Sequence, residues 1–448
     1  MVEKGRHGSG IPGSIAAYLT AGGLVSAAVA VPHAILTPLL LSKGLTLADI
    51  AFIQAVYSAV VLVTEYPSGV LADRLPRRRL FVVSKVLLVG FFVMVIMCSG
   101  LTWLTAAWAL YGLSSALDSG TIDSDLTVHL RRRLGDDAPT ALSRVTRWGS
   151  QINFAAMLVA SAIGSFAYFT IGSSAYWVSI GLTVLAVITV LLWFHVPDGR
   201  IHGQGATHRA ASSGPCSPHH GRASTTSGTG GSGVGSWITT TVRSVMGQMV
   251  DGWRELRSSV ALRRFVSLAI VSQVFFQTHF QFWQAFALAK GLPETALPVL
   301  YVLFQVISIL AGFVPVHALR ARPNRQGIAL LHALLLTLAI GLVAAPGAWS
   351  LLPYFVFVAG FSVLLNFCTY SLCRFISEEN MSAMTSFSSS ASRLGAIAAL
   401  SASAFFLRVG EPVTLQTVLF GLASVLVMWL LVHFPRPSTS GPRARVTP

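Results

Sequence analysis

Charged residues are scarce in this sequence. Asp, Glu, Lys and Arg make up only 10% of its 448 residues, whereas a typical soluble domain carries about 25%. The mean hydropathy is +0.68, and the apolar residues form long stretches without charge, which is typical of membrane spans. Disorder over most of the chain is excluded as well, because disordered segments are poor in apolar residues. The composition therefore predicts a polytopic membrane protein.

Cysteine is also scarce, and the common motifs of catalysis are missing. The four cysteines, Cys98, Cys216, Cys368 and Cys373, form no CxxC pair and have no zinc-like spacing to histidines. The sequence thus predicts neither a disulfide framework nor a metal site. There is no GxxxxGKS or GxxxxGKT loop for ATP, no nucleophile elbow and no HExxH helix. We therefore expect no enzyme, no cofactor and no ATP-driven pump.

Twelve apolar stretches are long enough to cross a hydrocarbon core of about 30 Å as helices. They lie near residues 15–41, 47–71, 80–99, 102–128, 147–170, 174–195, 265–289, 294–318, 326–345, 349–376, 382–407 and 412–434. We therefore expect an all-α integral membrane protein with twelve transmembrane helices.

Lys and Arg are distributed unevenly over the loops between these stretches. The net charge is +15, but only Lys43, Lys290 and Arg408 of the 31 basic residues fall in loops on the side opposite the two termini. Cytoplasmic loops are enriched in Lys and Arg. We therefore expect both termini in the cytoplasm, and we attribute the positive charge to topology rather than to a nucleic-acid partner. The first apolar run is too long for a signal peptide and should be retained.

The segment between the sixth and seventh stretches has a different composition. Residues 199–236 are rich in Gly, Ser, Thr and His, which is typical of a flexible linker. Beyond it, apolar residues recur at helical spacing near several arginines, which predicts an amphipathic helix on the cytoplasmic membrane face; they are Val242, Met246, Met249, Trp253 and Leu256. We therefore divide the chain into a six-helix bundle (1–198), a cytoplasmic linker with this helix (199–262) and a second six-helix bundle with a short tail (263–448).

The two halves resemble each other at a nearly constant offset. The tripeptide that begins at Lys43 reappears at Lys290, 247 residues later (290 − 43), and Pro76 matches Pro323 at the same offset. Arg147 and Arg393 open the fifth and eleventh stretches at an offset of 246 (393 − 147). Two similar bundles around a central site are a recurring transporter architecture, so the repeat predicts two pseudo-symmetric six-helix bundles.

A charged motif follows the second stretch and reads Gly69-Val-Leu-Ala-Asp73-Arg74-Leu-Pro76-Arg77-Arg78-Arg79. It resembles the G-x-L-A-D-R-x-G-R-R/K loop of the major facilitator superfamily, which stands at the same place among twelve spans. The preceding Glu65-Tyr-Pro-Ser-Gly69 is similar to the E-x-P-S/T-G version of many bacterial drug exporters. The resemblance implies the fold of that superfamily and a multi-pass transporter in the bacterial plasma membrane.

Glu65, Gly69 and Asp73 share one helix face because they are spaced by four residues. Gly69 lets another helix approach closely, and Asp73 can then meet the positive N-terminal dipole of that helix. The resemblance implies that this partner is the start of the eleventh span, near 382–385, and that the two elements form a gating latch. The gating motif also includes Arg74, Arg77 and Arg78. These arginines either bridge to acids at the ends of neighbouring helices or only fix the orientation of the protein in the membrane.

The sequence also departs from the family's patterns. Pro76 replaces the second Gly of the loop motif, and Arg320 occupies the position equivalent to Asp73 in the second half. The Gly-Pro signature of drug/proton antiporters is absent from the fifth span, and the Arg common in their fourth span is missing. These departures leave the exporter subtype open.

In the superfamily, spans one, four, seven and ten line the central cavity, and each carries polar side chains here. Glutamines that face lipid would be costly, so we expect a substrate cavity or, alternatively, hydrogen bonds and packing between helices. The candidate cavity residues are His33, Thr37, Gln273, Gln277, Phe280, Gln281, Gln284, Asn366 and Tyr370.

Three membrane-embedded acids are candidates for proton coupling. Asp118 lies deep in the fourth span, where an ionisable residue points to function, although a structural hydrogen bond between spans would also explain it. Glu65 is the reserve candidate, and Asp123 resembles an acid that many E-x-P-S/T-G members carry. We expect proton-coupled export of a small amphiphilic compound, such as an antibiotic or toxic metabolite, by a monomer. The alternatives are an uptake symporter of the same fold and a non-transporting membrane sensor or partner.

Overall fold

The computed structural model describes residues 10–118, 121–134, 138–194, 260–315, 325–375 and 381–432, with a few single residues between 247 and 257. Inside some helices, the segments around Asp73 and Tyr370 among them, only the backbone is described. The linker 199–236 and the position of Arg320 lie outside the described residues, as does most of the expected interfacial helix.

Throughout this described part the chain is helical and contains no strand. The first half consists of α1 (Gly10–Ala30), η1 (His33–Ile35), α2 (Leu36–Ser42), α3 (Leu47–Arg74), α4 (Arg77–Met97), α5 (Leu101–Asp118), α6 (Ile122–Leu134), α7 (Ala138–Ile171), η3 (Gly172–Ala175) and α8 (Tyr176–Trp193). The second half consists of α10 (Val260–Ala289), η4 (Glu294–Ala296), α11 (Leu297–Gly312), α12 (Arg325–Ala344), η6 (Gly347–Ser350), α13 (Leu351–Phe375), α14 (Met381–Phe406) and α15 (Pro412–Val432).

The apolar stretches of the sequence form these helices. Seven segments of the described chain are long and apolar enough to cross a membrane, and one of them, Trp148–Trp193, includes both α7 and α8. Large apolar side chains cover the exterior, as Val63, Phe166 and Phe405 illustrate with more than two thirds of their surface exposed. Such an exterior suits lipid rather than water.

Two of the expected helices are interrupted. The first stretch breaks between α1 and η1, at Pro32, because proline has no N–H for the helical ladder and clashes with the preceding turn. The fourth stretch ends as α5 at Asp118 and resumes as α6 at Ile122. Between them Thr121 donates both its N–H (3.3 Å) and its hydroxyl (2.8 Å) to the Asp118 carbonyl, which closes a tight turn.

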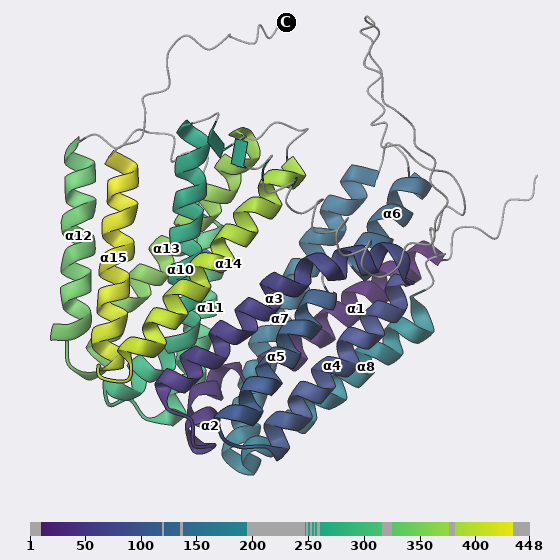
Figure 1. Ribbon diagram of the computed structural model, residues 1–448, viewed down its shortest axis with the longest axis horizontal. Helices are drawn as coiled ribbons and strands as arrows, with labels where there is room; N and C mark the ends of the chain where they lie inside the picture. The colour runs from purple at the N-terminus through teal and green to yellow at the C-terminus, as the bar shows by residue number, and fades with distance from the viewer. Residues whose placement is uncertain are drawn as a thin grey trace, which may run out of the picture.

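The helices form two bundles that correspond to the two halves of the chain (Figure 1). Each has its own apolar core, around Phe92 and Trp108 in the first half and around Phe275 and Tyr354 in the second. Contacts of α3 with α14 and of α7 with α11 join the bundles. Figure 1 shows that the bundles lie together at the end that carries α2 and diverge toward the other end. We call these the closed end and the divergent end.

Equivalent lysines tie down the closed end of each bundle. Lys43 donates to the carbonyls of Ile96 (3.3 Å) and Cys98 (3.0 Å). Lys290, 247 residues later, donates to Val343 (2.9 Å) and Ala345 (3.0 Å) at the same offset. Desolvation lowers the pKa of both ammonium groups. The internal repeat of the sequence is therefore also a repeat of side-chain contacts.

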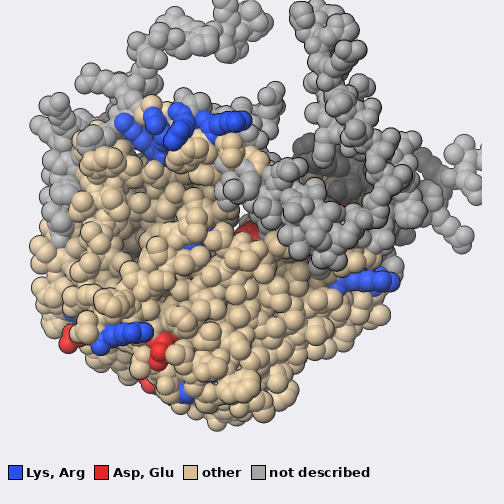
Figure 2. Space-filling view, viewed as in Figure 1, with Lys and Arg blue, Asp and Glu red and all other residues tan. Residues whose placement is uncertain are grey.

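Charge is unevenly distributed between the two ends. Figure 2 shows Lys and Arg gathered at the divergent end, where α10 begins. Exposed arginines there include Arg257, which stacks on Trp253 at 4.9 Å, and Arg263. Between the two ends the visible surface is almost free of charge, as expected for the band that contacts hydrocarbon.

Candidate functional site

The first feature of the site is a charged pair inside the first bundle. The Lys85 Nζ of α4 lies 2.7 Å from an Asp118 carboxylate oxygen at the end of α5. The Lys85 side chain is only 2% exposed, whereas that of Asp118 is 36% exposed. Breaking a buried pair by removing one partner typically costs about 3–5 kcal/mol, because an uncompensated charge remains. The two residues must therefore be treated as one unit.

Neighbouring groups hold this pair in place. The Ser84 hydroxyl lies 3.3 Å from the other Asp118 carboxylate oxygen, and Ser114 donates to the Ser84 carbonyl at 2.8 Å. The Lys85 ammonium also lies 4.8 Å from the centre of the Phe81 ring, a favourable cation–π geometry. Because α4 packs closely on α5, these contacts fix the carboxylate at the break between α5 and α6.

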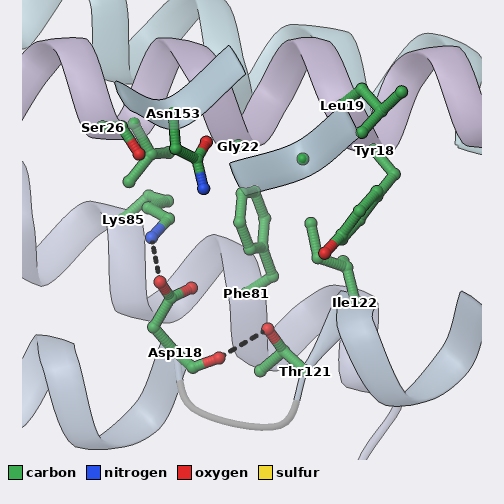
Figure 3. A pocket seen from close by; sticks show the side chains of 12 residues that line it. Tyr18, Leu19, Gly22, Ser26, Phe81, Lys85, Asp118, Thr121, Ile122 and Asn153 are labelled. Atoms are coloured by element: carbon green, nitrogen blue, oxygen red, sulfur yellow. Dashed lines mark hydrogen bonds and ion pairs between the residues drawn. The ribbon is translucent and has the colours of Figure 1, made fainter. Parts of the chain in front are cut away.

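The pair lines a cavity of about 230 Å³ between α1, α4, α5, α6 and α7. Its polar side chains converge from four helices and the turn before α6, as Figure 3 shows, and they are Tyr18, Ser26, Lys85, Asp118, Thr121 and Asn153. Gly22 keeps one wall open, because a Cβ there would already lie 3.5 Å from the Asn153 amide oxygen. A cavity with convergent polar groups and an ion pair is the expected form of a small-molecule site.

Asp118 was a candidate from the sequence alone, but its partner was missed. A lysine inside the apolar stretch 80–99, as Lys85 is, is as costly as an acid and was an equally strong signal. The polar cluster of the second bundle was missed in the same way. There the His279 Nδ1 lies 3.1 Å from the Tyr354 hydroxyl, which also accepts from Gln416 at 2.6 Å.

A second ion pair connects the two bundles. The Glu65 carboxylate of α3 lies 3.1 Å from the Arg393 Nε of α14, and both side chains are about one third exposed. The sequence places the latch between Asp73 and the start of this same helix. The side chains of Asp73 and Arg74 and the surroundings of Gly69 are not described, so that prediction stays a prediction. Among the described side chains of this helix face, Glu65 contacts α14 through an ion pair.

The arginines after α3 make their contacts within the first bundle. Arg77 pairs with Asp125 of α6 at 3.4 Å, and Arg78 donates to the Leu191 carbonyl of α8. Both guanidinium groups thus join the ends of neighbouring helices. The side chain of Asp123, the third candidate acid, is outside the described part.

Gln284 of α10 crosses between the bundles at the closed end. Its side-chain amide donates to the His33 carbonyl at 2.6 Å and accepts the Thr37 N–H at 2.7 Å. The helix break at Pro32 leaves these two backbone groups without partners in the chain's own ladder. Gln284 and Thr37 are again 247 residues apart, so equivalent positions of the two repeats meet here. The His33 ring lies parallel to that of Tyr301 at 6.4 Å.

The remaining predicted cavity residues differ in exposure. Along α10, Gln273 and Phe280 are exposed, Gln277 and Gln281 are half-buried, and Gln284 is buried. Asn366 of α13 is exposed, and the side chain of Tyr370 lies outside the described residues. Gln284 therefore acts at the contact between the bundles, while the other glutamines are accessible from outside the packed core.

Replacing Gln284 with Leu is expected to open the closed end. The variant loses two hydrogen bonds worth about 1 kcal/mol each, which amounts to roughly a thirtyfold shift in a two-state equilibrium. The probe is Thr37→Cys in solubilised, otherwise cysteine-free protein, and the measurement is its rate of labelling by a maleimide. Thr37 is only 4% exposed in the wild type, so labelling should be slow before the closed end opens. Gln416→Leu is the matched control, because its amide bonds only within the second bundle. Equal labelling rates in all three proteins would contradict the role given to Gln284.

Two helical bundles with an apolar exterior, an ion pair inside one bundle and a second pair between the bundles are the features of a multi-pass membrane protein. The family model described as Major Facilitator Superfamily matches residues 14–400. The chain belongs to this family, as its loop motif predicts.

Solved structures agree with this fold. The chain is similar to the nucleoside transporter NupG, with a TM-score of 0.64 and 13% identity over 94% of this chain and 100% of that one. It is also similar to the POT family transporter PepTSo, with a TM-score of 0.61 and 13% identity over 94% and 96% of the two chains. A bacterial homologue of the human lysosomal transporter Spinster, inward-facing and unoccupied, gives a TM-score of 0.60 and 10% identity over 95% of both chains. No curated protein matches the sequence.

Proposed function

We propose that the protein is a secondary active transporter that exports a small amphiphilic compound in exchange for protons. The observation that carries this proposal is the Lys85–Asp118 pair, because it places titratable groups on the wall of a cavity inside a membrane bundle. Ionisable residues at such depth are costly and are retained for substrate or proton pathways. Export is favoured by the Glu65-Tyr-Pro-Ser-Gly69 sequence and its likeness to drug exporters.

The proposed transport cycle is alternating access in a monomer of the bacterial plasma membrane. The bundles correspond to 1–198 and 263–448, carry twelve spans in total and rock about the contacts of α3 with α14 and of α7 with α11. The concentration of Lys and Arg at the divergent end supports its assignment to the cytoplasm, with both termini on that side. In this orientation the cavity beside Asp118 communicates with the cytoplasm, from which an exporter must load.

The topology has a direct test. Reporter fusions at Lys43 and at Ser213 should give opposite signals, because they lie in loops on opposite sides of the membrane. Opposite signals with Ser213 in the cytoplasm support the proposal. Identical signals would overturn both the number of spans and their orientation.

The proposed direction is tested with a deletion strain. We expect the strain to become more sensitive to toxic amphiphiles, and the intact gene but not one encoding Asp118→Asn to restore resistance. The alternative is uptake by symport, as the nucleoside and peptide transporters of similar fold suggest. Loss of growth on a nutrient, with unchanged toxin sensitivity, would favour that alternative and contradict export.

A further inference from the structure

We propose that the cavity beside the Lys85–Asp118 pair binds a small amphiphilic organic cation on Asp118, and that Lys85 releases the proton that is exchanged for it. This inference rests on the proposed function and names the substrate class and the proton carrier of the same site. It follows from the exposure of the two charges, the lining of the cavity and the charge balance of the pair.

The two members of the pair differ in what they offer a ligand. The Asp118 side chain is about one third exposed, and one of its carboxylate oxygens pairs with Lys85. The Lys85 side chain, in contrast, is almost completely buried. A molecule in the cavity therefore meets the acid first. The other polar groups on the wall are the hydroxyls of Tyr18, Ser26 and Thr121 and the amide of Asn153, and Figure 3 shows the pair lying among them. These neutral groups can accept hydrogen bonds from a cation.

The aromatic side chains add a second feature that suits a cation. Tyr18 and Phe81 lie on the wall of the same cavity, and the Phe81 ring already holds the Lys85 ammonium at 4.8 Å. Aromatic faces attract cations of any chemistry. A ligand with a positive centre and an apolar body therefore complements this wall: its charge faces Asp118 and its apolar body faces the aromatic rings.

The charge balance explains the exchange. In the empty site the Asp118 carboxylate, at 2.7 Å, compensates the charge of the Lys85 ammonium. A ligand cation on the same carboxylate would leave two positive charges for one acid. Loss of the proton from Lys85 removes this excess positive charge. The Nζ–H bond breaks, the electron pair stays on nitrogen, and the proton passes to solvent. One cation enters and one proton leaves, which is the stoichiometry of an antiporter.

Other charged groups near α4 are already occupied. On the described residues of the helices packed against it, Glu65 of α3 pairs with Arg393 and Asp125 of α6 pairs with Arg77. Arg78 binds a carbonyl of α8. Tyr111 of α5 and Tyr18 of α1 are phenols, which are neutral at physiological pH. His129 and Arg133 of α6 take part in other interactions, and Arg79 of α4 is exposed. Lys85 and Asp118 are the charged residues that line this cavity.

The test uses benzyltrimethylammonium, a permanent cation with no proton of its own, and the purified full-length protein. Calorimetric titration in two buffers of different ionisation enthalpy should show release of about one proton per cation bound, and affinity should rise about tenfold per pH unit. Lys85→Arg keeps the charge but cannot release a proton, so it should lose the proton release and most of the binding. Lys290→Arg, which changes a lysine that only binds backbone carbonyls, should behave like the wild type.

A steric variant separates binding from charge. Gly22→Leu should fill the cavity and abolish binding, while Gly13→Leu on the same helix, where nothing lies within 4 Å of an added Cβ, should not. Binding without proton release, or the same pH slope in Lys85→Arg, would overturn the role of Lys85. Preferential binding of phenylacetate with proton uptake would overturn the cationic substrate class. If either occurs while a pH gradient still drives transport in vesicles, the proposed function stands and only this inference fails.

Discussion

Asp118→Asn is expected to abolish transport driven by a pH gradient and exchange of substrate for substrate as well, because the substrate cation loses its carboxylate partner. The amide keeps the shape of the carboxylate but removes the charge that compensates Lys85 at 2.7 Å. Without that charge the site can no longer alternate between a proton-loaded and a cation-loaded form. The expected loss is at least about a hundredfold, because a coupling site contributes to every turnover and a buried charge pair is worth several kcal/mol.

The measurement compares gradient-driven and exchange transport in proteoliposomes. Because Asp118→Asn leaves Lys85 buried and unpaired, the double variant Lys85→Met with Asp118→Asn serves as the folding control. A neutral replacement of both partners is often tolerated, so this protein should be stable and still uncoupled. Gradient-driven transport that survives in Asp118→Asn but fails in Glu65→Gln would exchange the roles of the two acids.

Arg393→Glu is expected to cause the second large effect. It places a carboxylate against Glu65 across the contact of α3 with α14, where the wild type has an ion pair at 3.1 Å. The attraction itself is modest, since both side chains are about one third exposed and such pairs contribute about 1 kcal/mol or less. The variant loses this attraction and gains a repulsion between two carboxylates, which acts directly between the bundles. We expect transport to fall by about tenfold or more, and labelling of Thr37→Cys at the closed end to rise.

The control for this prediction reverses both charges. Glu65→Arg combined with Arg393→Glu restores an attractive pair at the same place and should recover most of the transport and the slow labelling. Recovery in the double variant separates a contact between the bundles from a separate function of either residue. If the swap stays as inactive as the single reversal, the pair does not act through its mutual attraction.

The sequence predicts much of the fold because the membrane imposes simple rules. Apolar runs of about 20 residues become helices, since a helix satisfies its backbone hydrogen bonds within one segment. Accordingly, α3, α4 and α10–α15 follow the predicted stretches closely. The break at Pro32 is not predicted, since the stretch 15–41 is expected to form one span, although a proline inside it signals an interruption. The offset of 247 residues correctly relates Lys43 to Lys290 in their carbonyl contacts.

The site was only partly predictable, because its contacts join residues far apart in the chain. Asp118 is recognisable as a costly acid in a span, but its pairing with Lys85 depends on the packing of α5 on α4. In the sequence Gln284 is one of four glutamines on a helix face, yet its amide binds backbone groups of Thr37 and His33, 247 and 251 residues away. That contact exists only because the first span breaks and the bundles meet at this end. Periodicity cannot supply such information.

Proton-driven accumulation in sealed vesicles tests the central claim most directly. Purified protein is reconstituted without ATP, and a pH gradient, acidic inside, is the only source of energy. With benzyltrimethylammonium outside, the wild type should concentrate the cation in the vesicles while protons leave, and collapse of the gradient should stop both fluxes. Accumulation that is indifferent to the gradient, or equally strong in Asp118→Asn, would contradict a secondary transporter coupled through the Lys85–Asp118 pair.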